Sequence, residues 1–231
     1  MTFAGPDHIS DFATLPRIPA WVTSARAEAI EDVAFLSGAA LNHLHLVLGR
    51  EEVPLVLLRD RLALRAAEAC VAYSGRPERA GELRDAVQFL LPGDHPGPAG
   101  EVYLSWRRVV ERPVSVKTLY RALPAFEAEQ IGAWLDVGQG MPVTRAAAVL
   151  EAVLVAAPRA EGSALIVAEA ALAQACGWDH LVPLLAAGLN RTDLRKRGGD
   201  LRLACHRAVA ASTGEAVPLA LDLARRAAHL N

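Results

Sequence analysis

The basic side chains that could bind an anion concentrate near the C-terminal end of the chain. The cluster comprises Arg191, Arg195, Lys196, Arg197, Arg202 and Arg207. Guanidinium groups bind phosphate oxygens in pairs, and a helix that starts near Asp200 would add backbone N–H donors. The nearest aromatic residue is Trp178, so the cluster lacks a platform on which bases could stack. The pattern therefore allows a phosphate or nucleic-acid contact, but it favours a solvated helix end that pairs with acidic residues of 125–190.

A second candidate site is the proline- and glycine-rich stretch 92–100 and the segment that follows it. The residues of interest are Asp94, His95, Arg107 and Arg108. A carboxylate, an imidazole and two guanidinium groups in one region could bind a small anionic ligand or perform acid–base chemistry. In the alternative interpretation the stretch is a structural connection in which Asp94 caps a turn. Because proline restricts the unfolded chain, we expect the loop to be ordered and packed on the helix that carries Trp106.

Histidine and cysteine pairs that resemble metal ligands have unsuitable spacing. These pairs are His43 with His45, Cys176 with His180, and Cys205 with His206. Residues two apart face different sides of a helix, adjacent residues diverge by ~100°, and Gly177 interrupts the remaining pair. The sequence also lacks a phosphate-binding loop and a hydrolase nucleophile elbow. It therefore predicts no catalytic residue, no metal site and no cofactor.

Composition and charge narrow the class of protein further. The 231 residues are 52% apolar with a net charge of −2, and the three cysteines are odd in number and widely spaced, which predicts a reducing, cytoplasmic setting without disulfides. The start of the chain lacks the pattern of a signal peptide, and no apolar run reaches the ~18–20 residues of a membrane span. Residues 125–190 carry seven acidic and two basic side chains, whereas residues 191–231 carry four acidic and eight basic side chains. We interpret this contrast as complementary faces within one fold or between subunits.

Helical periodicity dominates the elements that must position these residues. Alanine and leucine are abundant, at 45 and 33 residues, and apolar stripes at three- to four-residue spacing support the assignment. Helices are predicted at 25–48, 55–74, 77–91, 101–111, from 115 to before 124, and at 127–137, 142–157, 161–176, 179–189, 201–212 and 215–229. The first two are predicted to form an antiparallel hairpin.

The predicted fold is all-α without a sheet, built of stacked antiparallel helical hairpins as a solenoid-like stack or an irregular bundle. Residues 1–20 are expected to form a loose arm, and residues 21–231 a single helical domain that could divide into halves 21–112 and 113–231.

Several segments give the chain a family resemblance. They are Arg61–Cys70, the loop Leu91–Gly100 leading to Trp106–Arg108, Gly177–Leu185 and Asp193–Arg197. Together they resemble a bacterial all-helical family known only as a domain of unknown function, over nearly the whole chain beyond the first ~20 residues. The resemblance implies an uncharacterised cytoplasmic helical protein and transfers no catalytic residue.

Three functions are compatible with the sequence. We favour a non-enzymatic interaction or scaffold module that binds a protein partner or a second copy of itself. The alternatives are a nucleic-acid-associated regulator that uses the basic cluster at 191–207, and a small anionic-ligand binder or enzyme at 92–108. No membrane interaction is predicted.

Overall fold

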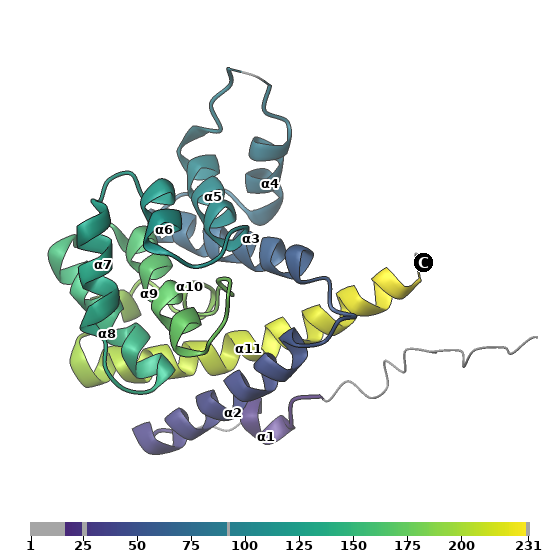
Figure 1. Ribbon diagram of the computed structural model, residues 1–231, viewed down its shortest axis with the longest axis vertical. Helices are drawn as coiled ribbons and strands as arrows, with labels where there is room; N and C mark the ends of the chain where they lie inside the picture. Colours follow the sequence, from purple (N-terminus) through teal and green to yellow (C-terminus); the bar gives the residue numbers. More distant parts are fainter. Residues whose placement is uncertain (1–16, 25–26, 92, 230–231) are drawn as a thin grey trace, which may run out of the picture.

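The computed structural model describes residues 17–24, 27–91 and 93–229. Within these ranges the chain is helical and contains no strand, which confirms the all-α prediction (Figure 1). Most of the predicted N-terminal arm lies outside the described residues. The elements are α1 (Ala20–Ser24), α2 (Ile30–Leu48), α3 (Leu55–Tyr73), α4 (Ala80–Gln88), α5 (Gly97–Val110), α6 (Val116–Ala122), α7 (Ala128–Val137), α8 (Pro142–Ala156), α9 (Glu161–Ala175), α10 (Leu185–Gly188), a 3₁₀ turn at Asp193–Arg195, and α11 (Gly198–Ala228).

Helix α9 forms the centre of an irregular bundle. All ten residues from Ala164 to Ala173 are buried, because this helix is apolar on every side except at Glu169. It pairs with α8 across the short connection 157–160 and also contacts α3, α5, α7 and α10. A single apolar core contains residues from both predicted halves of the domain. None of the described helices is long and apolar enough to cross a membrane.

Helices α2 and α3 do not form the predicted hairpin. Helix α2 packs along α11, whereas α3 packs mainly against α5, and the two helices diverge from the turn that joins them (Figure 1). Each helix nevertheless buries most of the stripe of apolar residues that was expected along one of its faces. The stripes face different partners, however, and periodicity alone does not identify the partner of a stripe.

The stripe of α3 predicts a large effect for Leu62, whose side chain is 2% exposed. Leu58 and Ala66 on the same stripe are also buried, whereas Leu55 and Ala69 at its ends are half-buried. We expect Leu62→Ala to lower the free energy of unfolding by about 2–5 kcal/mol, measured by urea denaturation. The control is Leu57→Ala, at an exposed position of the same helix. An unchanged midpoint for Leu62→Ala would contradict this packing.

One C-terminal helix replaces the two that were predicted. Residues 201–212 and 215–229 belong to the 31-residue helix α11, which continues through Gly214 and Pro218. Proline and glycine weaken a helix interior. Here Thr213, Ala216 and Val217 are buried on either side of those positions, so tertiary packing outweighs the local preference.

The helix predicted at 179–189 is mostly absent. Residues 178–184 are not helical, and α10 begins only at Leu185. Pro183 disfavours the helical conformation for Val182, the residue before it. The buried carboxyl group of Glu169 on α9 accepts the backbone N–H groups of Leu184, Leu185 and Ala186 at the start of α10.

Helix α5 begins four residues earlier than predicted, at Gly97. Pro98 lies in its first turn, where proline is well tolerated. The second half of the predicted loop is therefore the start of the helix that carries Trp106. A Cβ atom at Gly100 would lie 2.6 Å from Cβ of Pro96, so residues 96–100 pack closely on themselves; Pro92 lies outside the described residues.

Candidate functional site

Asp94 and His95, the first candidates, lie in an exposed turn. Oδ2 of Asp94 accepts the N–H of Leu91 at 3.0 Å, and the Asp94 N–H donates to the Leu91 carbonyl at 3.0 Å. These two hydrogen bonds match the alternative interpretation of the sequence, in which Asp94 caps a turn. No hydrogen bond or ion pair among the described residues joins Asp94 or His95 to Arg107 or Arg108. A ligand site at 92–108 stays a prediction.

Arg107 has acidic partners of its own. Its Nε lies 2.9 Å from Oε1 of Glu111 and 3.6 Å from Oδ1 of Asp60, and the Tyr103 hydroxyl donates to the same Asp60 oxygen at 3.1 Å. Arg108 is exposed on the same helix. The positive charge of Arg107 is therefore already paired with acidic side chains of the protein.

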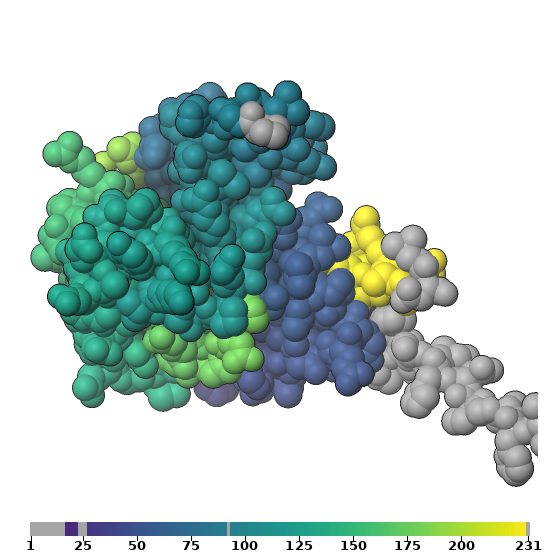
Figure 2. Space-filling model, turned by 45° about the horizontal axis from the view of Figure 1, so that its top comes forward, coloured from purple at the N-terminus to yellow at the C-terminus, as the bar shows by residue number. Residues whose placement is uncertain are grey.

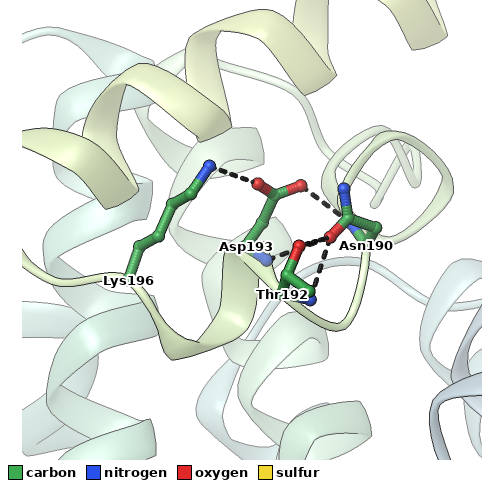
Figure 3. A network of polar contacts seen from close by, with 4 residues as sticks. All are labelled: Asn190, Thr192, Asp193 and Lys196. Carbon is green, nitrogen blue, oxygen red and sulfur yellow. Dashed lines mark hydrogen bonds and ion pairs between the residues drawn. The ribbon is translucent and has the colours of Figure 1, made fainter.

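The basic cluster lies on the surface, as expected: all six of its residues are exposed. The predicted pairing with acids of 125–190 is wrong for these side chains. Nζ of Lys196 instead pairs at 2.6 Å with Asp193, which belongs to the same turn (Figure 3). The other oxygen of Asp193 accepts the Asn190 N–H, and Oδ1 of Asn190 accepts from Thr192. This turn is built by its own polar residues.

One acidic residue of 125–190, Glu151, does reach this turn, but it bonds the backbone instead of a basic side chain. Both carboxylate oxygens of Glu151 accept the N–H of Gly198, at 3.1 and 3.2 Å, at the start of α11. A helix N-terminus attracts anions because its first amides lack partners. Since Glu151 occupies this end of α11, the additional phosphate donors expected there are partly taken.

The geometry that best fits a ligand site lies elsewhere, between α2, the start of α8 and α11. A pocket of about 420 Å³ lies there. It is lined by Ala34, Ser37, Gly38, Leu41, Asn42, His45, Met141, Pro142, Val143, Thr144, Cys176, Trp178 and His206. This volume is in the range of small-molecule pockets, and no lining residue is an Asp, Glu, Lys or Arg. The pocket suits a largely apolar molecule.

A buried polar pair forms part of the pocket wall. Ser37 on α2 and His206 on α11 are 1% and 5% exposed, and Oγ of Ser37 lies 2.6 Å from Nδ1 of His206. Burial, and then the positive charge of Arg202, lower the pKa of His206 below its ordinary value, so the ring is neutral at neutral pH. The second ring nitrogen, Nε2, has no hydrogen-bond partner among the described residues, which leaves it available to a ligand.

The N-terminus of α8 supplies further polar groups to the same pocket. Its N-cap residue, Met141, provides no side-chain hydrogen bond, and Pro142 occupies the first helical position. The amides of Val143 and Thr144 belong to the first turn, where no helical partner exists. Both residues line the pocket. A carbonyl or other acceptor on a ligand could therefore bond these amides.

Trp178 and His45 form another part of the pocket wall. The indole Nε1–H of Trp178 donates to Nδ1 of His45 at 3.0 Å, so the proton of a neutral His45 ring is on Nε2. Cys176 also lines the pocket, but burial raises the pKa of its thiol to about 11. It is therefore a thiol and a weak nucleophile at neutral pH.

The His and Cys pairs considered in the sequence gain no further ligands in the part of the chain that the structure describes. There, no three His, Cys, Asp or Glu side chains come together as a ligand set.

Sequence patterns contained an indirect signal for the pocket residues. Ser37 falls one helical turn from Val33 and Ala40, within the buried stripe of α2, and His206 follows Cys205 in the buried stripe of α11. Polar residues at buried positions need partners. The sequence did not reveal that these two residues, 169 positions apart, are partners of each other.

Comparison with known proteins identifies a family. A family model described as Protein of unknown function (DUF1403) matches residues 6–231. The chain belongs to this family. The match confirms the resemblance to an all-helical domain of unknown function and covers the pocket, the basic cluster and the 92–108 segment alike. No curated protein and no solved structure matches the chain.

Proposed function

We propose that this protein is a non-enzymatic binding module whose pocket between α2, α8 and α11 takes a small, largely apolar molecule with a hydrogen-bond acceptor. The observation that carries the proposal is the pocket of about 420 Å³, in whose wall Nε2 of the buried His206 has no hydrogen-bond partner among the described residues. Apolar walls would provide most of the affinity, and His206 with the α8 amides would orient the acceptor.

Binding fits the polar groups better than catalysis does. Oγ of Ser37 lies 2.6 Å from Nδ1 of His206 and 3.0 Å from the Ala34 carbonyl oxygen, so its single proton has two competing acceptors. The proposed contact requires the tautomer in which Ser37 donates to Nδ1, because the proton of the neutral ring is then on Nε2 and can bond a ligand acceptor. No described carboxylate is hydrogen-bonded to His206, and a Ser–His pair without an orienting acid lacks one part of a hydrolase triad. The cytoplasmic setting that we propose suits the three cysteines, which form no disulfide.

A protein partner or a second copy of the chain is a further candidate, favoured by exposed aromatic residues on α1 and α2. Trp21 and Phe35 are 51% and 67% exposed, and their rings stack with centroids 5.9 Å apart. Large exposed aromatic side chains are common in interfaces. The nucleic-acid alternative has less support because Lys196 and the start of α11 already have acidic partners.

The proposal predicts that Gly38→Leu abolishes binding of the neutral apolar dye Nile red. A Cβ atom at Gly38 would meet nothing within 4 Å, so leucine would occupy the pocket without displacing backbone. Wild-type protein should enhance the dye's fluorescence saturably, and Gly38→Leu should lose at least about ten-fold in affinity, or ~1.4 kcal/mol.

The matched control is Gly38→Ala. Both substitutions remove a flexible glycine from a helix and should raise stability by up to about 1 kcal/mol, but alanine leaves most of the pocket open. Equal dye binding by wild type, Gly38→Ala and Gly38→Leu would show that the dye binds elsewhere and would overturn the proposal. Stability is followed by thermal unfolding in the same buffer.

A further inference from the structure

A second hollow, of about 230 Å³, lies on the other side of the Trp178–His45 pair. Its lining includes Leu48 at the end of α2, Arg59 on α3, and Asp179 and His180 after α9. The hollow therefore lies between the end of α2, the start of α3 and the non-helical segment after α9. In Figure 2 the blue part of the chain near residues 50–60 adjoins the light-green part near residue 180.

Arg59 is the positively charged side chain of this hollow, and it has no hydrogen-bond or ion-pair partner among the described residues. Its side chain is half-buried, and its Nε is fully buried without an acceptor. Arg59 makes no hydrogen bond or ion pair with any described residue, in contrast to Arg107 on the neighbouring helix. Burial lowers the pKa of Arg59, although a guanidinium stays charged at neutral pH. A charge that is partly removed from water is costly unless a counterion accompanies it.

His180 places a second basic group beside Arg59. After burial, the positive charge of Arg59 is the next cause that lowers the pKa of His180, which indicates that the two side chains are close. Asp179 also lines the hollow, but no hydrogen bond or ion pair connects its carboxylate to Arg59. With His180 neutral, Arg59 is the one positively charged side chain among the residues that line the hollow, so an anion would be held at its guanidinium group, against some repulsion from Asp179.

We propose that this hollow binds the carboxylate of a small molecule, with the Nη groups of Arg59 as the main donors and His180 as the second. Guanidinium N–H groups lie in one plane and match the two oxygens of a carboxylate. The site is small, so it suits a compact acid or the acidic end of a longer molecule. This inference rests on Arg59 and its surroundings, independently of the apolar pocket.

The test compares the melting temperature of the protein in acetate, benzoate, inorganic phosphate and chloride at matched ionic strength. A ligand that binds the folded state raises the melting temperature with its concentration. We expect acetate and benzoate to raise it relative to chloride, and Arg59→Gln to lose this rise. Without added acid, Arg59→Gln should melt at the same or a higher temperature, because a partly buried charge is removed and no hydrogen bond or ion pair with a described residue is lost.

The matched control is Arg61→Gln, an exposed arginine of the same helix that does not line this hollow. It should retain the full response. If Arg59→Gln folds poorly, His180→Gln takes its place and should weaken the response to both acids. An equal response in Arg59→Gln and wild type would overturn the proposal, as would no response of the wild type. A response to phosphate alone would overturn the carboxylate assignment.

Discussion

Replacement of Glu169 by leucine is expected to cost several kcal/mol, a large part of the ~5–15 kcal/mol that stabilises a typical domain. Oε1 of this buried side chain accepts the backbone N–H groups of Leu184, Leu185 and Ala186 at 2.7, 2.6 and 3.1 Å. Leucine fills similar space but leaves three buried donors unpaired, at about 1–3 kcal/mol each. The measurement is the free energy of unfolding in urea.

The control, Glu169→Gln, retains an oxygen for these donors and should cost much less. It should also change how stability depends on pH. Burial raises the pKa of Glu169 to about 8, against the opposing effect of the three hydrogen bonds. The folded state therefore holds a proton that the unfolded state releases at lower pH.

Because of this difference, the contribution of Glu169 is fully present at acidic pH and is lost as the pH rises toward 8. Between these limits, wild type should lose up to about 1.4 kcal/mol per pH unit relative to Glu169→Gln. Parallel stability profiles of the two proteins between pH 5.5 and 7.5, a range of about two units chosen to lie below the raised pKa, would argue against a neutral buried Glu169.

Replacement of Gly188 by alanine is expected to have the next largest effect, a loss of about 1–3 kcal/mol or more. A Cβ atom at this position would lie 2.5 Å from the Ala208 carbonyl oxygen and 2.7 Å from Oγ of Ser212. The Ala208 atoms belong to the backbone of α11, so α10 would have to move away from that helix. Thermal unfolding measures the effect.

The control for Gly188 is Gly132→Ala on α7, where a Cβ atom would meet nothing within 4 Å. This change should leave stability unaltered or raise it by up to about 1 kcal/mol, because alanine favours helix. If the two substitutions shift the melting temperature alike, the close approach of α10 and α11 is not a determinant of stability.

Local features of the sequence were sufficient for the helices but not for their partners. Ser115 is a case where the local signal holds: its hydroxyl caps α6 by accepting the Thr118 N–H at 3.1 Å. The helix predicted at 179–189 fails because α10 depends on two distant side chains. Glu169 bonds its first amides, and the hydroxyl of Tyr73 on α3 donates to the Ala186 and Leu189 carbonyls. Pro183 is a local sign against helix in this segment, but no pattern within 179–189 identifies these two distant partners.

The residues of the candidate site were even harder to predict from local sequence patterns than the partners of the helices. Charge density directed attention to the basic cluster and to the 92–108 segment, where charged residues are mostly solvated or paired. The pocket is instead lined by residues from four distant parts of the chain, and none of them is an Asp, Glu, Lys or Arg. Isolated polar residues in apolar helices, such as Ser37, Glu169 and His206, were the useful signal, because each has to find a partner in the core.

The most direct test of the pocket is nitrogen-15 NMR of the histidine rings during titration with cyclohexanone, a compact apolar molecule with one carbonyl acceptor. The His206 signals are assigned with His206→Asn, which can still reach Ser37 but lacks Nε2. If the pocket binds such molecules, the Nε2 signal of His206 will shift saturably, while those of His95 and His229, which do not line the pocket, will not. An unchanged His206 signal at saturating ketone, or the same shift in Gly38→Leu, would contradict the account.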